Sequence, residues 1–206
     1  MVYSISPDIW WGEVHLPFVP QGDAADKCDA TEVDKNYQCW VQKNNMQKRS
    51  FNIEYEVYGS IDDLKKEDTE LLASAREFTK EAYAPYSNFY VSAIAKLVDG
   101  NIVKGTNQEN ASYPVGICAE RVLLSNAAIL FNNVAIDTIA ISYDNKNGES
   151  TKVISPCGMC RQALVEYEQR VKHPIRIILS GLSGEVYVIK KANELLPLAF
   201  NENDMK

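Results

Sequence analysis

Apolar residues recur with two characteristic periods along most of the chain, and these periods predict where its helices and strands lie. One run recurs at helical spacing and predicts a helix that packs one face on a sheet and ends before Pro85. That run comprises Leu71, Leu72, Ala75, Phe78 and Ala82. Further helices are expected over about residues 118–131, 157–168 and 192–196.

Runs rich in β-branched and aromatic residues predict the strands. They cover residues 91–98, 102–106, 138–143, 176–179 and 186–189, with an edge strand over 51–58. The dipeptide Asp99-Gly100 suits the tight turn of a hairpin between the first two of these runs. Strands and helices interleave after the hairpin, so we expect an α/β layered fold with a mixed sheet.

Residues 1–47 differ from the rest and are interpreted as an N-terminal extension ahead of a globular domain over 48–206. All three tryptophans, Trp10, Trp11 and Trp40, fall in this part, which shows no sustained periodicity. The extension is a docking arm, an artefact of expression or of the gene start, or a partly disordered tail. The sequence leaves these alternatives open.

Charge and composition limit the kinds of binding partner and the cellular location to be expected. The formal net charge of −7 argues against nucleic acid, because nucleic-acid binding depends on basic residues that neutralise phosphates. A small-molecule substrate is therefore expected. Asp8 and Glu13 interrupt the early apolar stretch, so neither a signal peptide nor a membrane span is predicted. Five cysteines, three of them closely patterned, suit a reducing compartment and predict a cytoplasmic protein.

Three cysteines are spaced to hold one metal ion. Cys157 and Cys160 open one predicted helix and Cys118 opens another, so two helix N-termini can bring the thiols to one point. The positive end of a helix dipole favours the thiolate, which is the form that binds zinc. Three protein ligands leave the fourth position open, as in catalytic zinc sites. The alternatives are a structural site completed by Cys28 or Cys39, or buried thiols without a metal.

Glu120 follows Cys118 by two residues, on the first turn of the same predicted helix. From there a carboxylate can exchange protons with a water at the metal without binding the ion, which is a general acid/base position. The alternative is that Glu120 only complements the helix dipole. The neighbouring cysteines favour the acid/base interpretation.

Five segments, in order, resemble the small cytidine deaminases over about residues 73–200. They are 83–89 (YAPYSNF), 107–113 (NQENASY), 118–121 (CAER), 155–162 (SPCGMCRQ) and 195–200 (LLPLAF). The resemblance implies a three-layer α/β/α fold with a mixed, mainly five-stranded sheet, and it makes 48–206 a catalytic domain. It also implies zinc-dependent deamination of cytidine and deoxycytidine in pyrimidine salvage, by a homotetramer, although a dimer is an alternative.

The resemblance assigns roles to the individual residues. Glu120 would protonate N3 of the pyrimidine and then the departing amine. Asn107 and Glu109 match the polar side chains that hold the ribose hydroxyls, and Phe89 matches an aromatic residue that packs on the base or sugar. Without the resemblance, these three residues would be a polar strand end and a core phenylalanine.

Other roles implied by the resemblance involve backbone groups and neighbouring subunits. The Ala119 N–H would bind the pyrimidine O2, and the Ser155 carbonyl would accept from the exocyclic amine. Tyr113 and Phe200 match residues that reach the site from neighbouring subunits, with ordinary packing as the alternative. Arg121 matches an arginine that hydrogen-bonds the zinc thiolates and offsets their charge, with a surface salt bridge as the alternative.

Three rival functions stay open. A deaminase of another aminopyrimidine, such as blasticidin S, shares the Pro-Cys-Gly-Met-Cys-Arg segment, but Asn107 with Glu109 favours an ordinary ribose. Nucleic-acid editing needs a basic channel, which the acidic balance disfavours. A zinc-stabilised binding protein has no need for Glu120 beside an open metal position. One departure from the family is Ser92, where many members have glycine; it predicts tighter packing without a change in chemistry.

Overall fold

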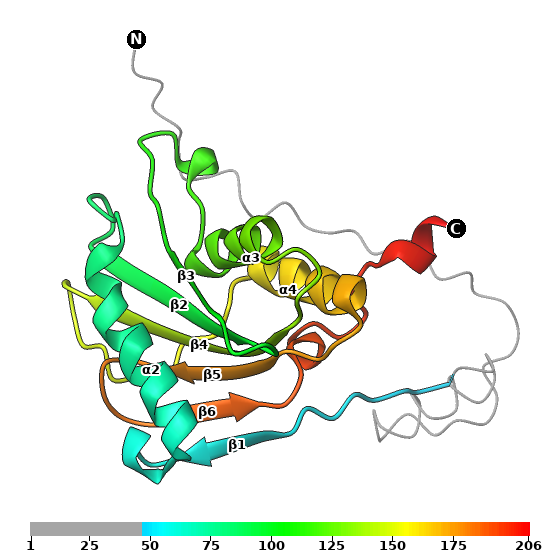
Figure 1. Cartoon of the computed structure of the whole chain (residues 1–206), viewed down its shortest axis with the longest axis horizontal. Coiled ribbons are helices and arrows are strands. Elements are labelled where there is room, and N and C mark those ends of the chain that lie inside the picture. Colours follow the sequence, from blue (N-terminus) through cyan, green and yellow to red (C-terminus); the bar gives the residue numbers. More distant parts are fainter. Residues whose placement is uncertain (1–46) are drawn as a thin grey trace, which may run out of the picture. The chain divides into compact units, whose positions relative to one another are not determined.

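A six-stranded mixed sheet forms the middle of the structure, in the spatial order β1-β6-β5-β4-β2-β3 (Figure 1). The computed structural model describes residues 47–206, so nearly all of the predicted extension of 1–47 lies outside the described part. The strands are β1 (Tyr55–Tyr58), β2 (Phe89–Leu97), β3 (Ile102–Thr106), β4 (Ile136–Asn145), β5 (Arg176–Ser180) and β6 (Val186–Ile189). Only β4 and β5 pair in parallel; each other neighbouring pair in this sheet is antiparallel.

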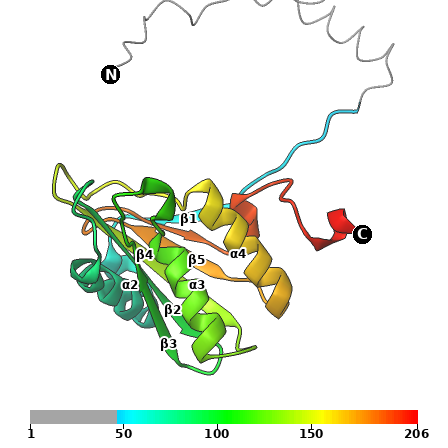
Figure 2. The same cartoon turned by 90° about the horizontal axis from the view of Figure 1, so that it is seen from above.

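Three helices cover the two faces of the sheet and complete a three-layer α/β/α fold (Figure 2). Helix α2 (Lys66–Phe78) lies on one face, and α3 (Ala119–Leu130) and α4 (Gly158–Val171) lie on the other. Each face buries its own apolar cluster, because successive strand residues point to opposite faces. None of the described helices combines the length and the apolar character that crossing a bilayer requires.

The predicted fold class is confirmed, and its element bounds need small corrections. The sheet has six strands rather than five, because β1 adds an edge strand beside β6. That strand is shorter than the predicted 51–58, since only Tyr55–Tyr58 finds a partner strand. Helix α2 ends at Phe78 instead of continuing to Ala82, and the next residues form a 3-10 turn (Thr79–Glu81). The Thr79 hydroxyl donates to the Arg76 carbonyl and so occupies an acceptor of the last helical turn.

Ser92 fixes α2 to the sheet. Its side chain is fully buried in β2, and its hydroxyl donates a hydrogen bond to the carbonyl of Ala75 in α2. A buried hydroxyl without a partner would be costly, so this contact is expected to favour one position of the helix on the sheet. The predicted effect of Ser92 on packing is therefore visible as a direct contact between two layers.

Candidate active site

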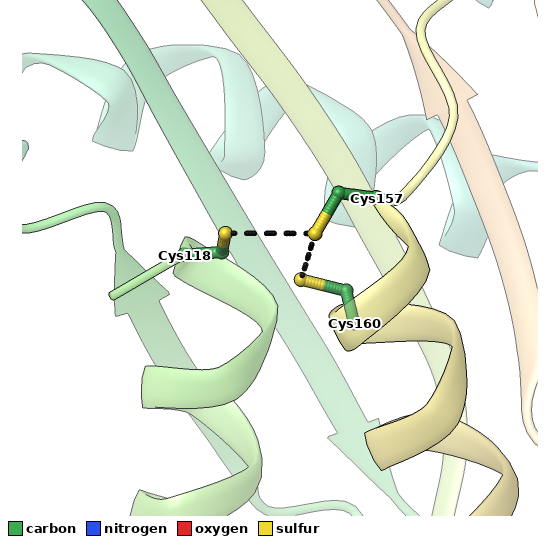
Figure 3. A group of neighbouring side chains, drawn as sticks. All are labelled: Cys118, Cys157 and Cys160. Atoms are coloured by element: carbon green, nitrogen blue, oxygen red, sulfur yellow. Dashed lines mark hydrogen bonds between the residues drawn. The ribbon is translucent and has the colours of Figure 1, made fainter. Parts of the chain in front are cut away.

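The sulfur atoms of Cys118, Cys157 and Cys160 point toward one another at the starts of α3 and α4 (Figure 3). Cys118 is the N-cap residue of α3, Cys157 is the N-cap residue of α4, and Cys160 lies in the first turn of α4. The Sγ atoms of Cys118 and Cys157 are 3.8 Å apart, and those of Cys157 and Cys160 are 3.4 Å apart. The three predicted ligands therefore form one group.

This group fits a zinc ion. All three Sγ atoms lie within 4.8 Å of one another and all three thiols are free. Thiolates about 2.3 Å from a tetrahedral zinc are separated by about 3.8 Å, close to the spacing found here. Residues 47–206 contribute three ligands to the group, which leaves one position for water or substrate, whereas Cys28 and Cys39 of the four-sulfur alternative lie outside the described residues.

The pKa values of Cys118 and Cys160 are shifted in opposite directions. A hydrogen bond from the Cys160 thiol lowers the pKa of Cys118 to about 6, against the opposing effects of burial and of the Glu120 charge. The positive charge of Arg121 adds to the lowering. Cys160 shows the opposite shift: the same hydrogen bond and its own burial raise its pKa. Without metal, Cys118 thus carries the negative charge and Cys160 keeps its proton.

Glu120 occupies the first turn of α3, and its side chain is 5% exposed. Burial raises the pKa of this carboxyl, while hydrogen bonds from its own backbone N–H and from the Cys160 thiol act in the opposite direction. A carboxyl with a raised pKa, in contact with the cysteine group, holds its proton to a higher pH than an exposed glutamate and can pass it to a neighbouring group. Its position and its electrostatics both suit the predicted general acid/base.

A cavity of about 470 Å³ opens directly onto this group. Its walls include most of the residues predicted from the sequence, namely Phe89, Asn107, Glu109, Cys118, Ala119, Glu120, Ser155 and Cys157. Apolar wall residues complete it, among them Val91, Ile117, Ile141 and Ile154. The cavity wall is thus largely apolar with a few polar groups, as expected of a small-molecule site.

Asn107 and Glu109 line the cavity, and both side chains form hydrogen bonds with nearby backbone groups. The Asn107 Oδ1 accepts from the Val91 N–H at 2.7 Å, and its Nδ2 donates to the Phe89 carbonyl at 2.8 Å. Glu109 Oε2 accepts from the backbone N–H groups of Tyr86 and Ser87 at 2.9 and 3.2 Å. Burial alone would raise the pKa of Glu109, but these hydrogen bonds and one from the Ser87 side chain lower it. Glu109 is therefore an anion whose position is fixed.

Four of the predicted residues are not part of the cavity wall: Cys160, which belongs to the cysteine group, and Tyr113, Arg121 and Phe200. Tyr113 is 77% exposed and packs edge-on against Tyr86, and Phe200 is 59% exposed. Arg121 lies in a shallow groove between α3 and α4, and within the described residues its side chain has no hydrogen bond to a cysteine sulfur. Its influence on Cys118 in this chain is through charge alone.

Other residues that shape the site were not singled out from the sequence. Arg161 joins two segments near the cysteines, since its Nε donates to the Pro156 carbonyl and its Nη1 to the Leu195 carbonyl. Val91 and Ile141 line the cavity from neighbouring strands. The alternation of strand residues contained the signal for Val91 and Ile141 but did not show which face of the sheet bears the site.

The fold and the three-cysteine group define a zinc-binding deaminase type of domain. The sequence model described as "Cytidine and deoxycytidylate deaminase zinc-binding region" matches residues 65–173, and the chain belongs to this family. That match begins after β1 and includes Cys118, Cys157, Cys160, Glu120 and the helices α2, α3 and α4.

Individual proteins that are similar to this chain are also named deaminases. The cytidine deaminase of Halalkalibacterium halodurans is 35% identical over 135 residues, which are 66% of this chain and 95% of that protein. The crystal structure of cytidine deaminase from Burkholderia pseudomallei superimposes with a TM-score of 0.56 at 34% identity and covers 66% of this chain and 100% of that one. The blasticidin-S deaminase of Bacillus cereus is 27% identical over 143 residues, 68% of this chain and 96% of that protein.

Proposed function

We propose that this protein hydrolyses cytidine and deoxycytidine to uridine and deoxyuridine, with release of ammonia, as an enzyme of pyrimidine salvage. The observation that carries the proposal is the position of Glu120, a buried carboxyl with a raised pKa that lines the cavity and contacts the three-thiol group. Two proteins that match this chain over nearly all of their own length are named cytidine deaminases, which supports cytidine as the substrate.

Zn²⁺ is the proposed cofactor, held by Cys118, Cys157 and Cys160; when bound, it acts as a Lewis acid and lowers the pKa of water. Glu120 is the group that moves protons. It takes one proton from the attacking water and transfers it to N3 of the pyrimidine; it then takes the second proton from the hydroxyl added at C4 and passes it to the amine, which leaves as ammonia. Because its pKa is raised, protonated Glu120 is populated closer to neutral pH than that of an exposed glutamate.

The cavity wall orients the nucleoside. In the proposed complex the Ala119 N–H binds the pyrimidine O2, the Ser155 carbonyl accepts from the exocyclic amine, and Phe89 packs on the ring. The ribose hydroxyls lie against Asn107 and Glu109. Glu109 accepts two backbone hydrogen bonds at its Oε2, and a carboxylate has further acceptor capacity that a sugar hydroxyl can use.

A homotetramer is the proposed assembly, and the cytoplasm is the proposed location. The exposure of Tyr113 and Phe200, 77% and 59%, supports sites completed by neighbouring subunits. Native mass spectrometry tests the assembly directly. Mixing Glu120→Ala chains with Phe200→Ala chains tests shared sites, since activity that exceeds that of either variant alone requires residues from different chains at one site.

Blasticidin S remains the alternative substrate, because one relative is a blasticidin-S deaminase. The pair Asn107 and Glu109 supports cytidine, since both line the cavity and match the polar residues that hold an ordinary ribose in the family. Comparing kcat/KM for cytidine and blasticidin S separates the two functions. A higher value for the antibiotic would replace the present proposal.

The first test is the loss of cytidine absorbance with purified, zinc-loaded protein beside Glu120→Ala. Removing the general acid/base is expected to lower kcat by about 100-fold or more while one zinc per chain remains. Glu77→Gln, an exposed α2 position whose carboxylate pairs only with Lys80 in the described structure, is the control and should retain wild-type activity. Wild-type protein that holds zinc and leaves cytidine unchanged would refute the substrate.

A further inference from the structure

We propose that Tyr143, a β4 residue outside the cavity wall, positions both the aromatic wall of the site and the loop that leads to the metal ligands. The side chain is 3% exposed and contacts two separate segments. Its ring contacts Phe89 and its hydroxyl contacts Lys152. The inference rests on the proposed nucleoside deamination, and it assigns Tyr143 as a positioning residue for that reaction.

The ring of Tyr143 supports Phe89 from behind. The two rings are stacked, with centroids 4.9 Å apart and an interplanar angle of 15°. Tyr143 lies opposite Val91 in the β2–β4 ladder, so Phe89 is its diagonal neighbour on the same face of the sheet. Phe89 itself lines the cavity. One face of the Phe89 ring is therefore covered by Tyr143, which restricts its rotation and fixes the plane it can offer to a substrate.

The hydroxyl of Tyr143 holds the β4–α4 loop, residues 146–157. It donates a hydrogen bond of 2.9 Å to the Lys152 carbonyl. Downstream of this point the loop contributes Ile154, Ser155, Pro156 and Cys157 to the cavity wall.

The first half of the loop is held separately. The Ser150 hydroxyl accepts from the Asn145 N–H at 2.8 Å, and the Asn147 Nδ2 donates to the Ser87 carbonyl at 2.9 Å. These contacts close residues 145–150 on themselves and on the segment before β2. The Tyr143 hydroxyl thus adds a hydrogen bond from the sheet to the part of the loop that precedes Ser155, where Val153 also packs against the core.

Tyrosine is the residue type that serves both contacts. Phenylalanine at position 143 would retain the stacked ring but leave the Lys152 carbonyl without its donor. Leucine would lose both contacts. Phe89 and Ser155, which both line the cavity, are therefore coupled through one buried side chain.

The test compares zinc-loaded wild type with Tyr143→Phe, Tyr143→Leu and Tyr167→Phe. Tyr167 is the matched control, since its ring is also buried, at 5% exposed, and it lies in α4 beneath Arg170, away from the cavity wall. Two measurements are made on each protein: hydrogen–deuterium exchange of the peptide spanning 146–156, and kcat and KM for cytidine.

In Tyr143→Phe, amides of 151–155 should exchange faster and KM should rise about 2- to 10-fold, the effect expected for loss of one hydrogen bond, while kcat changes less. Tyr143→Leu should show the same exchange and a further increase in KM, because Phe89 loses its support. Tyr167→Phe should match wild type in both measurements.

Unchanged exchange in Tyr143→Phe would overturn the loop contact, and faster exchange with unchanged KM would reduce Tyr143 to a purely structural residue. Equal KM values for Tyr143→Phe and Tyr143→Leu would overturn the role of the stacked ring. If wild type leaves cytidine unchanged while zinc is bound, the proposed substrate fails and with it the positioning role; the exchange data then still decide whether Tyr143 holds the loop.

Discussion

Gly105 on β3 lies directly against Ala119 at the start of α3. A Cβ atom added at Gly105 would fall 2.4 Å from the Ala119 carbonyl oxygen and 2.4 Å from the Leu123 backbone nitrogen. The absence of a side chain at this one position allows the N-terminus of α3 to approach the sheet. Cys118 and Glu120 flank Ala119, so this close approach also sets where the metal ligand and the proton carrier lie.

We therefore expect Gly105→Ala to destabilise the fold by about 3 kcal/mol or more, because backbone atoms on both sides must move. Chemical denaturation of the metal-free protein measures the change. Gly158→Ala is the matched control: its added Cβ meets nothing within 4 Å, so its stability should equal or exceed that of wild type. Equal stability of the two variants would contradict the close approach of α3.

Among Cys118, Cys157 and Cys160, Cys118 should be the most reactive thiol near neutral pH in the zinc-free protein. Its pKa of about 6 makes it largely thiolate at pH 7, and the thiolate is the nucleophile. Mass spectrometry of iodoacetamide-treated protein across a pH series should give a modification midpoint near that value. Cys160→Ala removes the main hydrogen-bond donor and should move the midpoint upward; an unchanged midpoint in this variant would disprove the assigned cause.

Glu120→Gln should stabilise the zinc-free protein at neutral pH. Burial places the pKa of folded Glu120 above its ordinary value of 4.5, so the stability linked to its proton is present below that value and is lost as the pH rises through the folded pKa. Glutamine resembles the protonated form and avoids this loss. Melting curves should show a higher Tm for the variant at about pH 7 and none of this advantage at about pH 4. A lower Tm for the variant at neutral pH would contradict the assigned shift.

The ion pair between Asp68 and Arg176 should contribute to stability without affecting catalysis. Its two hydrogen bonds, 2.6 and 2.7 Å long, join α2 to β5 at part-buried positions outside the cavity wall. Arg176→Met is expected to cost about 1–3 kcal/mol, because it leaves Asp68 without its partner. Lys66→Met, which removes an exposed pair at 3.9 Å, should cost about 0.5 kcal/mol or less. Denaturation and kcat/KM of the folded fraction check both claims.

The sequence predicted the helices and strands well where their periodicity was strong. The strands β3 and β6 have the predicted bounds, Ile102–Thr106 and Val186–Ile189. Element ends were less accurate. The predicted strand over 51–58 begins at Tyr55, because alternation alone does not show where a partner strand begins.

The candidate site followed from motif spacing, and its supporting contacts did not. The spacing of the cysteines and Glu120 indicated one metal group, since helix starts bring such residues together. The stacking of Tyr143 on Phe89 and the close approach at Gly105 depend on strand register and layer distance. These are properties of residues far apart in sequence, which local periodicity does not encode.

The pairing of β1 with β6 joins the first strand of the described residues 47–206 to the last one. A contact between such distant parts of a chain requires closure of a long loop, so it forms slowly unless the intervening structure has already folded. We therefore expect β1 to join the sheet late, after the family core that follows it has assembled. In kinetic terms the edge strand would then act mainly on unfolding: weakening it should speed the loss of the native state while leaving the rate of folding nearly unchanged.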